Sequence, residues 1–339
     1  MKKSLKLMAL GLAVVPCALV LTACGGDDGK LVNTDGNYAA IETTEYASVL
    51  TDLETRGLSL DNILGGARLT LDLDAEIGVL GTTMTASMTS DNYVRNSSEQ
   101  GQVDVKKIDM ISENSLSLVA ETGDEVMEYS ASVNQYLNGG VQYVDLTGAE
   151  ELLTAFGMQN MITNYKFYQN LAKGDESDIA VLPSYSITDL LDVVPEGTWG
   201  TNVIIEKSEE GDDYKIRTTI KGDFLKTMIE SALSQGSEQT TSVVTFNSIG
   251  DVVIYIVYNE AGLAGINVTA SIDMVANIPL DETNVMPLAI KADIELNMVG
   301  YNGEFDFPSD FNTYTELDTS ASTACLLYTS DAADDLTRV

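Results

Sequence analysis

The chain has 339 residues, of which 52 are acidic, 18 are Lys or Arg and none is His, so its formal net charge is −34. This charge repels phosphate backbones and anionic headgroups, which argues against nucleic-acid binding and against a basic membrane-docking surface. The lack of histidine excludes Ser-His-Asp and Cys-His catalysis and His-ligated zinc. Hydrophobic residues make up 44% of the chain and recur periodically, which favours a folded domain with an acidic surface.

The chain begins with the pattern of a secretory signal. Three lysines precede an apolar run, residues 7–21, that is shorter than a comfortable membrane span. The run ends in the motif Leu21, Thr22, Ala23 and Cys24. This motif resembles the bacterial lipoprotein lipobox, which implies transfer of diacylglycerol to the Cys24 thiol and cleavage before it. The alternative is an ordinary secretory signal that places a cysteine at its cut site by chance.

We therefore expect residues 1–23 to be a lipoprotein signal peptide. The mature chain would carry 15 basic and 52 acidic residues, a net charge of −37. Lipid on Cys24 would anchor it to the outer face of the cytoplasmic membrane, or to the outer membrane if the host has one. The other two cysteines are Cys17 in the signal and Cys325 near the end, so no disulfide framework is available.

The mature chain is expected to begin with a flexible Gly- and Asp-rich tether over residues 24–37. Apolar residues at helical spacing then predict an amphipathic helix over 42–56. Residues 68–79 alternate strictly between apolar and polar side chains, which predicts a long strand with one buried face. Further strands are expected over 82–88, 103–110, 115–120, 125–133 and 141–146, and later over 202–205, 214–220, 242–246, 251–258, 265–274 and 288–298.

Helices are expected between these strands. A capping-box pattern predicts one from Thr147 through Phe156, and the Met-, Tyr- and Phe-rich stretch 158–172 is expected to be helical as well. Two more are expected, capped by Ser186 and by Asp223. Residues 318–339 are expected to form a disordered tail. From Cys325 onward the sequence resembles the translation of a sequencing adapter, and we interpret residues 325–339 as an artefact.

This order of elements predicts an α+β fold: a curved antiparallel sheet, or half-barrel, whose concave face is covered by helices. The lipobox, the hairpin-like stretch 251–263 and the closing stretch 305–314 resemble the lipoprotein carrier superfamily of the LolA, LolB and LppX/LprG type. The resemblance covers about Thr43 to Leu317, and we expect residues 38–317 to form one domain of this kind. That superfamily includes lipid carriers and envelope-stress sensors, and it implies no catalytic residues here.

The resulting functional hypothesis is a monomeric, non-enzymatic lipoprotein that binds a lipid or other hydrophobic ligand between sheet and helices. Flexible apolar side chains on the expected covering segments are the candidate cavity lining: Phe156, Met158, Met161, Phe167 and Met228. The alternative is an acidic-surfaced interaction or sensor module with a filled core. Its supporting residues are Asp72, Asp74, Glu76, Asp293 and Glu295.

Catalysis and metal binding have little support in the sequence. The acidic spacing from Asp72 to Glu76 suggests calcium, but this stretch lacks the loop glycine and terminal glutamate of an EF-hand. No nucleotide-binding, nucleophile-elbow or redox motif occurs. We expect no catalytic residue, no metal and no cofactor, and the sequence identifies no protein partner.

Overall fold

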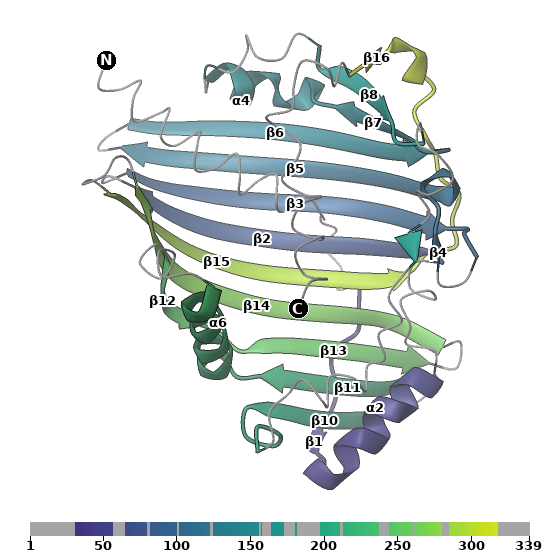
Figure 1. Cartoon of the computed structure of the whole chain (residues 1–339), viewed down its shortest axis with the longest axis vertical. Coiled ribbons are helices and arrows are strands. Elements are labelled where there is room, and N and C mark those ends of the chain that lie inside the picture. The colour runs from purple at the N-terminus through teal and green to yellow at the C-terminus, as the bar shows by residue number, and fades with distance from the viewer. Residues whose placement is uncertain are drawn as a thin grey trace.

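The computed structural model describes residues 31–56, 65–79, 82–99, 102–122, 125–155, 157, 164–172, 180–181, 197–210, 213–236, 244–259, 262–279 and 285–317. Within them, one broad sheet carries most of the chain (Figure 1). The expected signal peptide, the helix expected after Ser186 and the expected tail over 318–339, including the suspected artefact over 325–339, lie outside the described residues.

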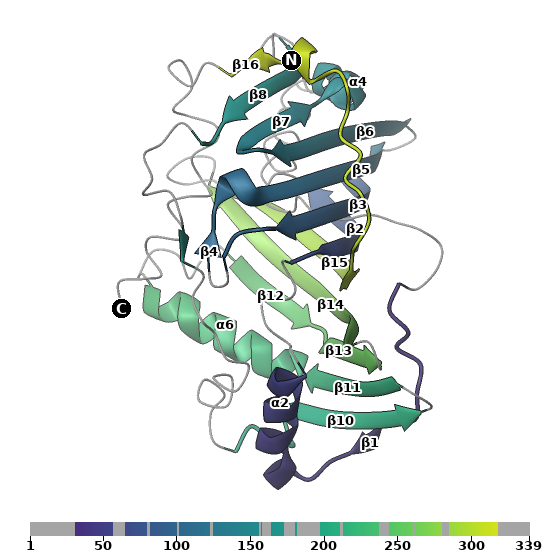
Figure 2. The ribbon, with the colours of Figure 1, turned by 90° about the vertical axis from the view of Figure 1, so that its right-hand side faces the viewer.

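Fourteen described strands form this sheet. They are β1 (Ala39–Ala40), β10 (Val203–Glu210), β11 (Asp213–Ile220), β13 (Val252–Asn259), β14 (Gly262–Pro279), β15 (Val285–Gly300), β2 (Ala67–Val79), β3 (Thr82–Asn96), β5 (Ile108–Thr122), β6 (Glu125–Asn138), β7 (Val141–Asp145), β8 (Lys166–Asn170) and β16 (Thr315–Glu316) in spatial order, with β12 (Val244–Ile249) beside β14. A separate pair is formed by β4 (Gln102–Val103) and β9 (Ala180–Val181). Figure 2 shows the strand direction turning along the sheet, as right-handed strand twist requires.

The described helices are α2 (Tyr46–Thr55), α4 (Glu150–Ala155) and α6 (Gly222–Gly236). Single 3-10 turns are formed by Thr43–Glu45, Val105–Lys107, Thr147–Ala149 and Phe311–Thr313. The amphipathic helix expected over 42–56 is confirmed by the first of these turns and α2, and the helix expected after Asp223 is confirmed by α6. By contrast, the strand expected over 103–110 is wrong in its first half, where Asp104 accepts a hydrogen bond from the Lys106 amide and begins a 3-10 turn.

Period-two alternation gives the long central strands two distinct sides. On the apolar face, Leu73 lies opposite Met88 and Met88 lies opposite Leu116. On the polar face, Asp74 lies opposite Ser87 and Ser87 lies opposite Ser117. The apolar face includes Leu71, Leu73, Met84, Met88 and Leu118, all buried. The polar face includes Asp72, Asp74, Thr85, Ser87 and Ser117.

The predicted α+β half-barrel with covering helices is wrong. The structure is predominantly β, and its sheet is open, running from β1 to β16 within the described strands. Every strand pairing in it is antiparallel except that of β16 with β8, which makes the sheet mixed. The helices α2 and α6 do lie on the apolar-face side, but α2 is confined to the β10–β13 end and α6 lies against β12 (Figures 1 and 2).

Two physical reasons account for this error. Part of the stretch expected to be a helix over 158–172 is β8, which takes its conformation from hydrogen bonding to β7 rather than from helical spacing of its aromatic residues. In addition, the central strands are much longer than their apolar runs suggested, because polar residues such as Ser90 and Asn114 continue the apolar face. Regular pairing therefore extends over 15 residues in β3 and in β5.

The predicted hairpin between β6 and β7 is confirmed. Gly139 and Gly140 have φ angles of 57° and 81°, which glycine adopts without steric cost. Gly140 is also tightly enclosed, since an added Cβ would lie 2.7 Å from the Ala172 Cβ. This turn needs glycine at its second position for both reasons.

Two chain segments cross the polar face at the end of the strands where β15 finishes, and both lie to the right of the sheet in Figure 2. Residues 301–314 form a row of aromatic contacts: Tyr301 packs on Tyr93 at 4.7 Å, and Phe311 stacks on Tyr143 at 3.8 Å. Lys166 of β8 ties this segment down through Asp310, at 2.8 Å. The described part of the expected tether, residues 31–37, also lies against the sheet, with Val32 only 3% exposed.

Candidate functional site

The structure describes two of the five predicted cavity residues, Phe167 and Met228, and it does not bring these two together. The lipobox residues Leu21, Thr22, Ala23 and Cys24 and the candidates Phe156, Met158 and Met161 lie outside the described residues. Phe167 lies on β8, while Met228 lies on α6, far from β8 in both views (Figures 1 and 2). The Met228 side chain is 42% exposed and contributes little to a core.

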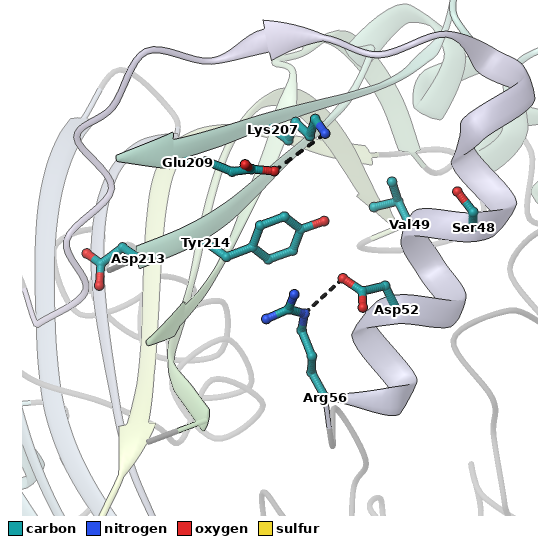
Figure 3. A pocket seen from close by; sticks show the side chains of 8 residues that line it. All are labelled: Ser48, Val49, Asp52, Arg56, Lys207, Glu209, Asp213 and Tyr214. Carbon is teal, nitrogen blue, oxygen red and sulfur yellow. Dashed lines mark hydrogen bonds and ion pairs between the residues drawn. The ribbon is translucent and has the colours of Figure 1, made fainter. Parts of the chain in front are cut away.

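A polar pocket of about 540 Å³ lies between α2 and the β10–β11 hairpin (Figure 3). It is lined by Ser48, Val49, Asp52, Arg56, Lys207, Glu209, Asp213 and Tyr214. Burial of the apolar side of α2 fixes its helical wall, since Leu50 and Leu53 pack against Ile205 and Ile216 of the sheet. The polar side of the same helix therefore faces the pocket.

Arg56 forms the shortest ion pair among the residues that line the pocket, with its side chain 42% exposed. Its Nε donates to Asp52 Oδ2 at 2.8 Å, one helical turn earlier. Its guanidinium carbon lies 4.4 Å from the centre of the Tyr214 ring and 6.0 Å from that of Tyr258, a cation–π arrangement. Hydrogen bonding to Asp52 raises the pKa of Arg56 further. Burial raises the pKa of the Tyr214 phenol, and the nearby Asp52 carboxylate raises it further.

The opposite wall holds two more ion pairs. Lys207 and Glu209, two positions apart on β10, approach to 3.5 Å. Behind the wall, the buried Lys215 ammonium lies 3.6 Å from the Asp213 carboxylate and donates to the Asp35 carbonyl at 2.7 Å. The residues that line the pocket thus include two cations, Arg56 and Lys207, and three carboxylates, Asp52, Glu209 and Asp213. Lys215 is not among them, because it follows Tyr214 on β11 and its side chain lies on the other face of the sheet.

The acidic residues predicted to share a surface do share one. Asp72 lies opposite Glu295, and Asp74 lies opposite Asp293, on the neighbouring strands β2 and β15. These four residues are called the carboxylate array below. Partial burial raises the pKa of Asp72, and the carboxylates of Glu295 and Asp74 raise it further. Like charges placed directly opposite one another destabilise a sheet.

Replacing Asp72 with asparagine is accordingly expected to raise the free energy of unfolding at pH 7 by up to about 1 kcal/mol. An acid whose pKa is higher in the folded state than in the unfolded state penalises folding when ionised. The gain should therefore shrink as the pH falls through the folded pKa toward about 3.9, where wild-type Asp72 becomes protonated. Urea unfolding at pH 7 and pH 4 measures both values. The exposed Asp306→Asn serves as control, and an equal gain in the two variants would contradict local repulsion.

The half of the polar face farther from the two crossing segments is open to solvent. Its exposed side chains include Asp74, Glu76, Thr83, Thr85, Ser87, Ser117, Glu121, Val126, Glu128, Ser130, Lys291 and Asp293. Lys291 is a cation in this set and lies 3.8 Å from Glu76. At the covered end, by contrast, Asn267 and Asn297 are buried and hydrogen-bonded to each other at 2.8 Å. The sheet therefore presents a continuous hydroxyl- and carboxylate-rich surface on its open half.

The pocket residues were not predicted from the sequence. One signal was present, because Asp52 and Arg56 are four positions apart on an expected helix and such pairs share a helical face. Nothing in the sequence showed that this face meets the end of β10 and the start of β11, more than 150 residues later. That juxtaposition depends on β1 pairing with β10, which places the start of the domain beside the β10–β11 hairpin.

Within the described part of the chain, no group of three or more His, Cys, Asp or Glu residues is arranged to hold a metal ion. None of the helices described has the length and apolar character needed to cross a membrane.

Comparison with known proteins identifies no family and only weak structural similarity. No family model matches the chain, and no curated protein matches it. Among solved structures, it is similar to the low-pH structure of OprB from Pseudomonas putida, with 7% identity, 76% of this chain and 99% of that chain covered, and a TM-score of 0.18. It is also similar to OpdQ from Pseudomonas aeruginosa, with 7% identity, 68% and 56% coverage and a TM-score of 0.13. Similarity this weak supports no argument about fold or function, and the resemblance to the lipoprotein carriers stays a prediction.

Proposed function

We propose that the protein is an exported, lipid-anchored, non-enzymatic binding protein of the cell envelope, which uses the open half of its polar face to hold a basic partner. The observation that carries this proposal is the carboxylate array in its exposed, hydroxyl-rich surroundings. Opposed like charges cost stability, and a basic partner would relieve that cost on binding. The lipobox at Cys24 supports the anchoring, and the net charge supports attraction of cationic groups.

The test uses a fluorescent decalysine peptide as the basic probe, with fluorescence anisotropy at low ionic strength. The doubly neutralised variant Asp74→Asn/Asp293→Asn should bind it about three- to tenfold more weakly than wild type. The matched control is Glu304→Gln/Asp306→Asn, which removes two exposed carboxylates from the segment crossing the other end of the polar face. Both variants change the net charge equally. They therefore separate a local site from the overall field.

The salt dependence of peptide binding is the second test. Binding should be lost near 1 M salt, where the screening length is about 3 Å. Equal weakening in the two double variants would overturn the proposal, since it would show that only net charge matters. Binding that survives high salt would overturn it as well, because contacts other than exposed carboxylates would then hold the peptide.

Binding of a hydrophobic ligand is the second candidate function. The observation that favours it is the methionine content of the apolar face, where Met84, Met88, Met127 and Met298 share one side of the sheet. Methionine adapts to irregular apolar ligands. Native mass spectrometry of protein purified without detergent tests this candidate. A spectrum without bound lipid, together with failure of the protein to take up a fluorescent fatty acid, would rule it out.

A further inference from the structure

The pocket between α2 and the β10–β11 hairpin carries an inference independent of the polar face. We propose that it is a binding site for a small zwitterionic ligand, an amino acid or short peptide with a free carboxylate and a free ammonium group. The Arg56 guanidinium receives the ligand carboxylate, and Glu209 receives the ligand ammonium. The volume of about 540 Å³ lies within the range of small-molecule sites.

The carboxylate end is set by how Arg56 is held. Asp52 accepts only the Nε hydrogen, and the guanidinium carbon lies over the Tyr214 ring, 4.4 Å from its centre. Within the described part of the chain, the two terminal nitrogens make no hydrogen bond to any side chain. Figure 3 shows the guanidinium pointing from the end of α2 into the pocket, below Tyr214. A guanidinium fixed in this way offers paired donors that match a carboxylate in two-point geometry.

The ammonium end is set by Glu209. In Figure 3 its carboxylate lies across the Tyr214 ring from Arg56, beside Lys207. The contact with Lys207, at 3.5 Å, is a loose ion pair between two largely exposed side chains, 44% and 65% exposed. Such a pair contributes little stability, so a ligand ammonium can share the Glu209 carboxylate at little cost.

The mixture of charges in the pocket favours a zwitterion over a simple ion. Two cations and three carboxylates line the pocket, so an ion of either sign meets repulsive groups as well as attractive ones. The protein as a whole is strongly negative, which further disfavours a simple anion. A ligand with no net charge avoids that repulsion, and its two charged groups can each face the pocket group of opposite sign.

Isothermal titration of the mature protein with trialanine, up to about 10 mM, tests the proposal. Three capped peptides serve as comparisons: N-acetyl-trialanine, trialanine amide and the doubly capped peptide. Trialanine should bind at least tenfold more tightly than either singly capped peptide, because each cap removes one charge.

Three variants at Arg56 and Glu209 test which pocket residue binds which end of the peptide. Arg56→Ala should abolish the preference for the free carboxylate over the amide, and Arg56→Lys should restore it only in part, because lysine lacks the planar fork. Glu209→Gln should abolish the preference for the free amine over the acetylated one. The matched control is Lys226→Ala, which removes the cation of an i,i+4 pair on α6, at 4.0 Å from Glu230.

Circular dichroism and thermal melting must show each variant folded. Equal binding of capped and uncapped peptides, or no binding of trialanine to folded wild type, would overturn the proposal. Carboxylate preference that survives Arg56→Ala would also overturn it. None of these results depends on decalysine binding, so the proposal for this pocket and the proposal for the polar face can be refuted independently.

Discussion

Replacing Cys24 with alanine is expected to abolish incorporation of labelled palmitate and to leave the protein at the size of its precursor. The thioether to diacylglycerol can form only on a cysteine thiol, and the predicted lipobox would place that thiol directly after the cut site. Metabolic labelling and mass spectrometry of the purified protein measure both effects. Because uncleaved precursor keeps its apolar run, membrane fractionation is not a sufficient readout.

The other two cysteines supply the controls for this experiment. Cys17→Ala and Cys325→Ala should each leave labelling and processing unchanged, since neither follows a lipobox. Labelling that persists in Cys24→Ala would contradict the lipoprotein assignment. Normal cleavage without any label in the wild type would instead favour an ordinary secretory signal.

The structure adds a geometric consequence to lipid anchoring. Val32, eight residues after Cys24, is buried near Gly265 at the end of the sheet where β15 finishes. Eight residues of extended chain reach no farther than about 29 Å. If Cys24 carries the lipid, that end of the sheet must therefore lie within this distance of the membrane. The open half of the polar face is at the other end of the strands, farther from the anchor along the sheet.

Much of the sheet was predictable because alternation is a local property. In residues 68–79 and 290–298, apolar residues alternate with residues that are polar or glycine, and both stretches lie in strands with the expected faces. The hairpin at Gly139 and Gly140 was predictable for a similar reason, since its signal lies in adjacent residues. The faces of a strand and a tight turn can be predicted in such cases because the signal lies in residues adjacent in the sequence.

The fold class was not predictable in the same way. Helical spacing over 158–172 did not decide the conformation of its last part, because pairing with β7 and β16 made residues 166–170 a strand. The polar residues Asn92, Ser112 and Asn114 gave no apolar signal, yet they occupy the apolar face and continue β3 and β5. Long-range pairing decided both stretches. The pocket depends on the same kind of pairing, through β1 and β10.

Leu53→Ala is expected to lower the free energy of unfolding by about 2–5 kcal/mol. The Leu53 side chain is 0% exposed and lies in the cluster that joins α2 to the sheet, with Ile216 and Ile256. Truncating this side chain removes buried apolar surface and leaves a cavity. The cavity cannot close by a shift of α2, because two hydrogen bonds hold the helix to the sheet. Tyr258 donates to the Leu53 carbonyl at 3.2 Å, and Tyr46 accepts from the Ile205 amide at 3.2 Å, so both ends of the helix stay in place.

Urea unfolding monitored by circular dichroism measures this loss, and the matched control is the same substitution at an exposed site. Leu171 is 37% exposed, and Leu171→Ala should change stability by less than about 1 kcal/mol. Leu53→Ala should also weaken trialanine binding at the pocket, because Asp52 and Arg56 are held by the helix that Leu53 anchors. A loss below about 1 kcal/mol for Leu53→Ala would show that α2 does not pack on β10, β11 and β13 as described, and the pocket would lose its helical wall.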